Sequence, residues 1–255
     1  MNNYQIGIDI GSTCAKAVVL SSDKKILQRV LLPTGWSSVD TAEKLKEALG
    51  PWLPEADTVA TGYGRACVPY AGRSVTEITC HGRGAAYLFG GPELTVIDIG
   101  GQDTKIIRLE QGQVSDFLMN DKCSAGTGRF LEIMAGTLGL RLEELCELAS
   151  TGGGTSISSM CTVFAESEVT SLIGRGEKRE NIAYAVVDSI VTKVMSQASR
   201  LLQGAGRVCL TGGLCELSYL RQALKKKLGR DVLTSPDARY AGAIGAALLA
   251  GKGAA

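Results

Sequence analysis

An internal repeat constrains the fold of this 255-residue chain more than any other feature of its sequence. Residues 8–16 read Ile-Asp-Ile-Gly-Ser-Thr-Cys-Ala-Lys, and residues 97–105 read Ile-Asp-Ile-Gly-Gly-Gln-Asp-Thr-Lys. In each copy an apolar run leads an aspartate into a tight glycine turn and a second apolar run leaves it, which is the pattern of a β-hairpin. Two such copies predict a duplicated fold.

Both predicted turns are suited to phosphate. Backbone amides exposed in a tight glycine turn bind phosphate oxygens, and a nearby carboxylate can hold Mg²⁺ through its water ligands. Two turns that face each other would form a phosphate clamp. The paired turns resemble those of the sugar kinase, Hsc70 and actin superfamily of ATPases, in which two duplicated domains close on a nucleotide.

The charge balance argues against two classes of partner. The chain has 27 basic and 26 acidic residues and a formal net charge of +1, so nothing favours nucleic acid or an anionic membrane. No charged and then apolar leader precedes Ile6, and the longest nearly uncharged apolar run, at 240–251, is too short to span a bilayer. We expect a cytoplasmic protein that binds neither nucleic acid nor membrane.

The first half of the chain has mainly strand patterns. Its expected elements are a β-meander over 4–32 with later strands at 15–20 and 25–32, a helix at 41–49 and a strand at 57–61. Thr41 is the expected cap of the helix, and Gly50 ends it. The single histidine, His81, is expected to be a packed or hydrogen-bonded side chain, and we leave it out of catalysis.

The second half repeats the meander and then becomes helical. Its expected elements are a hairpin with strands at 105–109 and 114–119, a helix opened by the glycine-rich loop 120–130, a long helix at 181–203 and a strand at 207–211. A helix of small residues, which permits close packing, follows Ser235. In the superfamily such a helix returns to the first domain, so we expect domains at 1–93 and 94–237, with the helix at 238–252 packed on the first.

Two of the eight cysteines are placed differently from the rest. The chain has no Cys-x-x-Cys pair, so we expect no disulfide framework and mostly inert thiols. Cys123 lies at or just before the helix that the glycine-rich loop opens, and Cys161 precedes a helical stretch with Thr162 as its possible cap. Helix N-termini lower thiol pKa values, so both cysteines can be thiolates.

The strings around these cysteines make the resemblance more specific. NDKCSAGTGRF at 120–130 and SMCTVFAESEV at 159–169 accompany VIDIGGQDTK, GYGR, TGG and GAIGAAL. Together they closely resemble the activators of 2-hydroxyacyl-CoA dehydratases, relatives of the benzoyl-CoA reductase ATPase subunits in the BadF/BadG/BcrA/BcrD ATPase family, over nearly the whole chain. The resemblance implies an α/β protein of two duplicated actin-like, ribonuclease H-like domains with a nucleotide cleft between them.

The resemblance also implies a function. Members of the family are homodimers with one 4Fe-4S cluster between the subunits, reduced by a ferredoxin or flavodoxin. ATP hydrolysis drives single electrons to a dehydratase or a related iron-sulfur reductase. A cubane cluster usually needs four thiolates, and only Cys123 and Cys161 stand in these motifs, so a two-fold axis must supply the other pair.

Position by position, the resemblance assigns a nucleotide site for ATP or ADP. The residues that it places around the nucleotide are Gly11, Ser12, Thr13, Cys14, Ala15 and Lys16 at the phosphates, Gly100, Gly101 and Gln102 at the γ-phosphate, and Gly212 and Gly213 beside the adenosine at a helix start. Asp9 and Asp98 would lie near Mg²⁺. Gln102 or Asp103 would orient the attacking water.

Two other functions stay open. The glycine turns would equally suit a sugar or acyl kinase, although the chain lacks an obvious insertion for a phosphoryl acceptor. An iron-sulfur redox sensor with weak ATPase activity would show nucleotide binding without turnover. We expect Cys14, inside the first turn, and Cys215, just past Thr-Gly-Gly, to be incidental rather than cluster ligands. The identity of the electron acceptor is left open.

Overall fold

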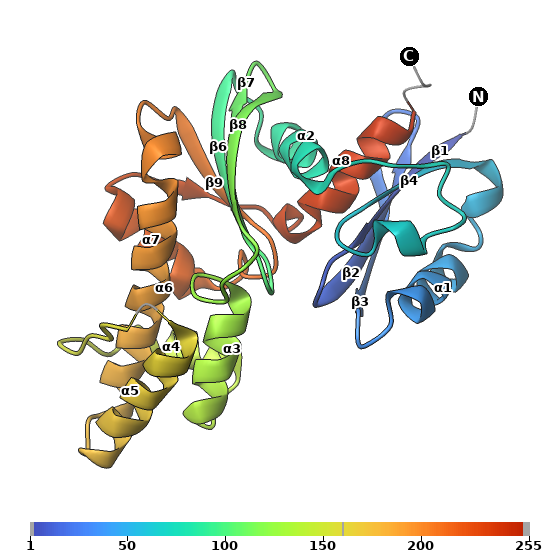
Figure 1. Ribbon diagram of the computed structural model, residues 1–255. Coiled ribbons are helices and arrows are strands. Elements are labelled where there is room, and N and C mark those ends of the chain that lie inside the picture. The colour runs from blue at the N-terminus through green and yellow to red at the C-terminus, as the bar shows by residue number, and fades with distance from the viewer. Residues whose placement is uncertain (1–2, 160, 252–255) are drawn as a thin grey trace. The chain divides into compact units, whose positions relative to one another are not determined.

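The structure is a computed structural model in which residues 3–159 and 161–251 are described. Its helices and strands have the α/β arrangement that the sequence predicts (Figure 1). The strands are β1 (Tyr4–Ile10), β2 (Cys14–Ser21), β3 (Ile26–Pro33), β4 (Ala56–Thr61), β5 (Arg73–Ser74), β6 (Glu93–Ile99), β7 (Thr104–Glu110), β8 (Gln113–Asn120), β9 (Arg207–Thr211) and β10 (Val232–Leu233). The helices are α1 (Ser38–Leu49), α2 (Glu77–Phe89), α3 (Gly128–Thr137), α4 (Leu142–Ala149), α5 (Thr162–Gly174), α6 (Arg179–Leu202), α7 (Ser218–Leu228) and α8 (Ala241–Ala250). Met160, in the second cysteine motif, lies outside the described residues.

The two sheets have the same strand order. The first runs β3-β2-β1-β4-β5 and the second runs β8-β7-β6-β9-β10, so each strand of one sheet has a counterpart at the same position in the other. In the first sheet β1 is antiparallel to β2 and parallel to β4. The matching order confirms the duplication predicted from the repeated turn.

The chain divides into two compact units. The first unit comprises Met1–Val96, Ile107–Phe117 and Ser235–Ala255, and the second comprises Ile97–Ile106 and Leu118–Thr234. The first contains the whole of the first sheet, and the second contains β9, β10 and the helices α3 to α7. Each unit therefore carries one copy of the Asp-Ile-Gly turn.

Helix α1 packs on the first sheet through Leu45 and Leu49, which share a buried cluster with β1 and β2. The helix begins earlier than predicted, so the expected cap was wrong. The hydroxyl of Ser37 accepts a 3.1 Å hydrogen bond from the amide of Asp40 and caps the helix there. Thr41 lies inside the first turn and donates its hydroxyl to a backbone carbonyl instead.

Helix α8 approaches its neighbours in the first unit at backbone distance. A Cβ atom added at Gly7 of β1 would overlap the carbonyl oxygen of Ala243, and one added at Gly245 would overlap the carbonyl oxygen of Cys80 on α2. The prediction that small residues permit close packing of this helix is therefore confirmed. Although α8 is apolar on all sides, no helix in the described ranges is long and apolar enough to cross a membrane.

The second unit contains the long helix that the sequence predicts. Helix α6 buries the stripe of Ile182, Val186, Ile190, Val194 and Ala198. At α5, however, Cys161 is the N-cap and Thr162 is the first helical residue, so the prediction that Thr162 caps this helix was wrong. Gly212 and Gly213 lie in a turn well before α7 begins, and therefore not at a helix start as predicted.

Candidate functional site

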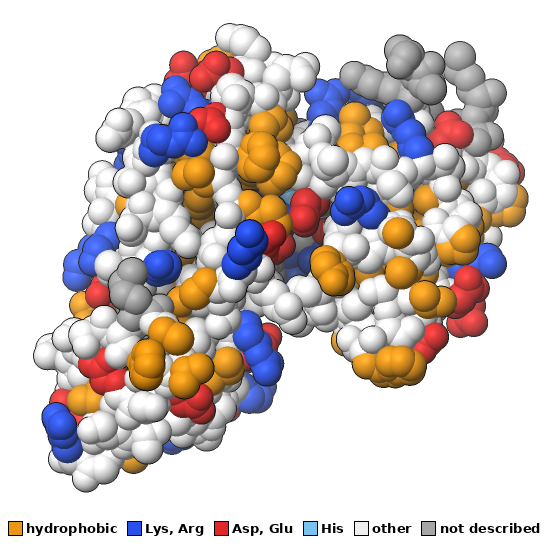
Figure 2. All heavy atoms as spheres, viewed as in Figure 1, with side chains coloured by type: hydrophobic (Ala, Val, Ile, Leu, Met, Phe, Trp, Pro, Cys, Tyr) orange, Lys and Arg blue, Asp and Glu red, His pale blue; other side chains and the backbone are white. Residues whose placement is uncertain are grey.

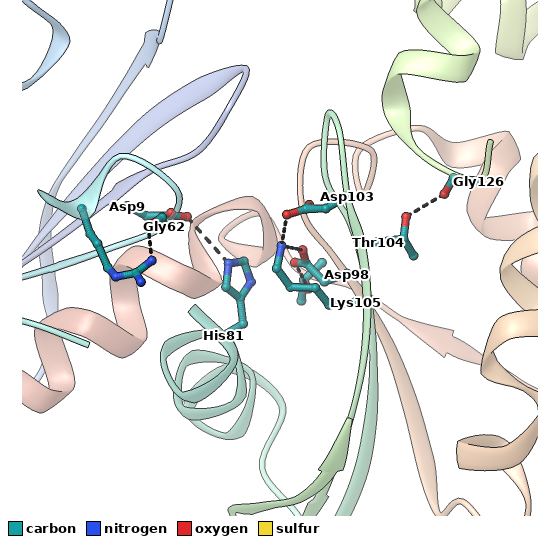
Figure 3. Close-up of polar contacts among 10 residues, drawn as sticks. Asp9, Gly62, His81, Asp98, Asp103, Thr104, Lys105 and Gly126 are labelled. Atoms are coloured by element: carbon teal, nitrogen blue, oxygen red, sulfur yellow. Dashed lines mark hydrogen bonds and ion pairs between the residues drawn. The ribbon is translucent and has the colours of Figure 1, made fainter. Parts of the chain in front are cut away.

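In the first unit, the candidate site is built on the buried carboxylate of Asp9 at the end of β1 (Figure 3). Two glycines leave room for this carboxylate. A Cβ atom at Gly62 would lie 2.5 Å from Oδ1 of Asp9, and a Cβ atom at Gly242 would lie 2.6 Å from Oδ2. Any larger residue at either position would displace the carboxylate.

His81 lies beside Asp9, although the sequence analysis left it out. Its Nε2 atom is 3.8 Å from Oδ2 of Asp9, and both side chains are buried (Figure 3). A Cβ atom at Gly242 would lie 2.7 Å from the same nitrogen. The local sequence around a lone histidine on α2 carries no signal for this contact, because the tertiary fold creates it.

Thr34 donates two hydrogen bonds to the backbone of the first turn. The Thr34 hydroxyl donates to the carbonyl oxygen of Gly11 at 2.7 Å, and the Thr34 amide donates to that of Thr13 at 2.9 Å. Ser12 and Thr13 form the solvent-accessible tip. The other predicted phosphate residues, Cys14, Ala15 and Lys16, begin β2, where the Ala15 side chain is fully buried and those of Cys14 and Lys16 are half-buried.

In the second unit, Asp98 occupies the equivalent position at the end of β6, and its polar partners include Thr211 on β9 and Lys105 on β7. The hydroxyl of Thr211 donates to Oδ2 of Asp98 at 2.6 Å. The ammonium of Lys105 lies 3.8 Å from Oδ1 of Asp98 and 2.7 Å from Oδ2 of Asp103 (Figure 3). Lys105 is only 3% exposed, and its buried positive charge is compensated by these two carboxylates. Lys105 is the last residue of the second copy of the repeat, and the repeat alone does not predict that it pairs with these carboxylates.

The second turn is docked on the N-terminus of α3. The amide of Gly100 donates to the carbonyl oxygen of Asp103 at 2.9 Å and closes the turn. The amides of Gly128 and Arg129, in the first turn of α3, donate to the carbonyl oxygens of Gly100 and Gly101 at 2.9 and 2.7 Å. Gln102 is exposed at the tip of this turn.

The predicted adenosine residues lie next to this turn. Gly212 has a φ of +85°, and an added Cβ atom there would overlap the carbonyl oxygen of Ile99. Only glycine fits this backbone conformation and this close approach. The second unit therefore brings Gly212 against the strand that carries Asp98, while Gly213 has open space around its Cα atom.

The eight cysteines are all free and differ in exposure. Cys123 and Cys161 are exposed, Cys14 and Cys67 are half-buried, and the buried ones are Cys80, Cys146, Cys209 and Cys215. Burial raises the pKa of Cys80 and of Cys146 to about 12 and also raises the pKa of Cys209. These three thiols remain protonated at neutral pH.

The residues that follow the two exposed cysteines are in contact. The hydroxyl oxygens of Ser124 and Thr162 lie 2.8 Å apart. Cys161 is the N-cap of α5. Cys123 lies four residues before Thr127, which is the N-cap of α3, so Cys123 is not at the start of that helix. Among the described residues, no group of three or more His, Cys, Asp or Glu side chains is placed to hold a metal ion.

Glu168 of α5 holds the segment that leads to Cys161. Its carboxylate accepts hydrogen bonds of 3.1–3.2 Å from the amides of Ser158 and Ser159, and it also accepts from both hydroxyls. Partial burial acts to raise the pKa of Glu168, but these hydrogen bonds outweigh it and lower the pKa. The sequence analysis did not identify this contact, which joins residues ten positions apart.

Comparisons with known proteins identify relatives that match over nearly their full length. The chain is 41% identical to the (R)-2-hydroxyglutaryl-CoA dehydratase activating ATPase of Acidaminococcus fermentans, with 100% of both chains covered. It is 42% identical to the activator of lactoyl-CoA dehydratase of Anaerotignum propionicum, with 97% of each covered.

Solved structures also resemble this chain. The activator of the 2-hydroxyisocaproyl-CoA dehydratase from Clostridium difficile, with bound ADPNP, superposes with a TM-score of 0.88 at 37% identity and covers 97% of this chain and 94% of its own. A ROK family glucokinase from Streptomyces griseus, at 14% identity and a TM-score of 0.61, covers 96% of this chain and 98% of its own and shows the shared fold alone. These likenesses confirm the predicted actin-like, sugar-kinase-like fold. The sequence profile of the BadF/BadG/BcrA/BcrD ATPase family matches residues 6–250, and the chain belongs to that family.

Proposed function

We propose that this ATPase is an electron-transfer activator, which as a homodimer with one bridging 4Fe-4S cluster passes single electrons to a 2-hydroxyacyl-CoA dehydratase or a related iron-sulfur reductase. The relatives named as dehydratase activators support the class of partner. The observation that carries the proposal is the 2.8 Å contact between Ser124 and Thr162, because each residue directly follows an exposed cysteine.

The thiols of this chain suit half of such a cluster. A cubane cluster is bound by four thiolates, and Cys123 and Cys161 would supply two, with a second copy related by a two-fold axis supplying the others. Val163 and Phe164, just after Cys161, are 66% and 67% exposed, and hydrophobic side chains gather on the surface over α3 and α5 (Figure 2). Such a surface favours contact with another chain. The bound cluster would supply a carrier for one electron at a time.

The nucleotide residues would act as follows. Asp9 and Asp98 are buried carboxylates, each at the start of a turn, and we infer that they hold Mg²⁺ through its waters. Gln102 is exposed at the tip of the second turn, which favours its role in orienting the attacking water, with Asp103 as the alternative. The remaining contacts to ATP and ADP would come from Gly11, Ser12, Thr13, Cys14, Ala15, Lys16, Gly100, Gly101, Gly212 and Gly213.

We infer ATPase domains at 1–93, together with the helix at 238–252, and at 94–237. The support is that each sheet falls within one of these ranges to within a single residue, since β1 to β5 end at Ser74 and β6 to β10 run from Glu93 to Leu233. A ferredoxin or flavodoxin would be the electron donor.

The test is anaerobic purification followed by iron, sulfide and ATPase assays on one sample. The proposal predicts about four irons and four sulfides per dimer together with ATP hydrolysis. A protein with no cluster that phosphorylates a sugar or an acyl acceptor would show instead that it is a kinase. A protein that keeps the cluster and binds ATP without turnover would be a sensor.

A further inference from the structure

The second phosphate turn is bonded directly to the loop that carries Cys123. The hydroxyl of Thr104, at the start of β7, donates to the carbonyl oxygen of Gly126 at 2.6 Å (Figure 3). Next to this bond, the amides of Gly128 and Arg129 donate to the carbonyl oxygens of the turn. Thr104 is 1% exposed, so water does not compete for its hydroxyl. One hydrogen bond therefore joins the residue after the turn to the Cys123 loop, and two more join the turn to the start of α3.

The Cys123 loop is itself tied at several points, so a shift at Gly126 must move its neighbours. The side-chain amide of Asn120 donates to the carbonyl oxygens of Cys123 and Ala125 at 2.9 and 3.1 Å. Gly126 has a φ of +89°, and a Cβ atom there would lie 3.0 Å from Cγ of Lys193 on α6. Packed segments of this kind transmit displacements because they cannot be compressed.

The two segments that carry the exposed cysteines line one pocket. It measures about 280 Å³ and is lined on one side by Ala125 and Gly126, and on another by Ser158 and Ser159. The lining thus includes residues two or three positions from each exposed cysteine.

We propose that Thr104 is a positioning residue that transmits the state of the nucleotide at the 100–103 turn to the Cys123 loop. The inference rests on the proposed function, because it assigns a γ-phosphate to Gly100 and Gly101. A phosphate that draws the amides of Gly101 and Gln102 toward itself moves the carbonyl oxygens of Gly100 and Gly101, because each of these carbonyls shares a peptide unit with one of the two amides. Thr104 carries that shift to Gly126, while Gly128 and Arg129 carry it to α3. A nucleotide can shift the equilibrium between two positions of the Cys123 loop only to the extent that it binds the protein with different affinity in each.

The test uses the metal-free chain and measures amide hydrogen exchange over residues 121–127 with ADP and with a non-hydrolysable ATP analogue. For the wild type we expect exchange rates in this loop to differ between the two nucleotides by about fivefold or more. Thr104→Val keeps the shape of the side chain and removes the hydroxyl, so the difference in exchange rates between the two nucleotides should fall below about twofold. Thr104→Ala serves for the same comparison if the Thr104→Val protein does not fold. Thr104→Ser restores a hydroxyl and should restore the difference.

Thr137→Val is the matched control. It removes a threonine hydroxyl from the same unit. That hydroxyl donates to the carbonyl of Ile133 on α3 and to the carboxylate of Glu166 on α5, and neither group belongs to the turn or to the Cys123 loop. The nucleotide response should survive this change. Thr104→Val with a wild-type response, or a wild type with no nucleotide-dependent exchange in the loop, would overturn the inference.

The same variants separate this inference from the proposed function. In the first case, the rate at which a chelator removes iron from the loaded wild-type protein depends on the nucleotide, and this dependence is unchanged in Thr104→Val. That result supports the proposed function and contradicts the role of Thr104. In the second case, the protein binds no iron, yet the nucleotide-dependent exchange of the loop is lost in Thr104→Val. That result contradicts the proposed cluster and supports the role of Thr104.

Discussion

The hydroxyl of Ser124 lies 2.8 Å from the hydroxyl of Thr162, and each of these residues directly follows an exposed cysteine. The contact joins the loop ahead of α3 to the first turn of α5. Thr162 is the first residue of α5 and not its cap, which is Cys161. The two segments that carry Cys123 and Cys161 are thus held together within one unit.

Replacing either exposed cysteine tests the cluster assignment. Cys123→Ser and Cys161→Ser should each lose the iron and leave nucleotide affinity largely intact, because the thiols and the phosphate turns are separate groups. Iron analysis and calorimetry on anaerobically purified protein give the two readouts. Cys67→Ser, which changes a half-buried thiol of the first unit, should keep about four irons per dimer. If Cys123→Ser or Cys161→Ser keeps about four irons per dimer, that cysteine is not a cluster ligand and the assignment is wrong.

Gln102→Ala should slow ATP hydrolysis by roughly tenfold or more and weaken ATP binding much less, because a side chain that orients water acts mainly in the transition state. Phosphate release and calorimetry measure the two effects. Gln102 is exposed, so the substitution leaves no cavity in the core. Gln113→Ala, at an exposed position on β8, is the control. Equal losses of binding and hydrolysis would move Gln102 to a binding role.

Gly245→Ala should destabilise the first unit. Its new methyl group would overlap the carbonyl oxygen of Cys80, so α8 and α2 would have to separate, at a cost of about 1–3 kcal/mol. Denaturant unfolding measures the change. Gly136→Ala, on α3, meets nothing within 4 Å and should be neutral or stabilising by about 0.5–1 kcal/mol. A neutral Gly245→Ala would mean that the two helices do not pack at backbone distance.

Much of the fold could be predicted because its signals are local. Glycine turns between apolar runs predict the hairpins, and the period of buried residues predicts α6. The start of α1 was missed because Ser37 and Thr41 are both good cap residues, and the contact between the Thr41 hydroxyl and the carbonyl of Thr34 decides between them. Helix α4 was missed because an isolated helix of eight residues has little stability of its own and forms by packing.

The candidate site could be predicted only in part. The repeat identified Asp9 and Asp98, but their partners come from distant parts of the chain. Thr211 is 113 positions from Asp98, and His81 lies on a helix that the tertiary fold brings to Asp9. Single-sequence patterns carry no information on such pairs.

Glu168→Ala should release the segment ahead of Cys161. The carboxylate accepts from two amides and two hydroxyls, so amide exchange at Ser158 and Ser159 should accelerate by about tenfold or more. Mass spectrometry of the exchanged protein measures it. Glu166→Ala removes the same charge from the same helix, where the side chain contacts Thr137 instead, and should leave both amides protected. Equal acceleration in both variants would indicate an effect of charge alone.

The same contact predicts a dependence on pH. Because the pKa of Glu168 is lowered in the folded protein, its stabilising contribution is complete above the ordinary carboxyl pKa of 4.5 and is lost as the pH falls through the lower folded value. Protection factors at Ser158 and Ser159, which remove the intrinsic pH dependence of exchange, should fall as the pH is lowered from the ordinary carboxyl value through the lower folded value. Glu168→Gln should show no such drop.

The central claim is that nucleotide and cluster affect each other, and the most direct measurement is an anaerobic redox titration of the loaded dimer with ADP, with a non-hydrolysable ATP analogue and with neither. Coupling is reciprocal, so the nucleotide must change the cluster's reduction potential if the cluster's oxidation state changes ATP affinity. We predict a shift of a few tens of millivolts between ADP and the analogue, roughly 1 kcal/mol for a one-electron couple. Three superimposable titrations would contradict the account.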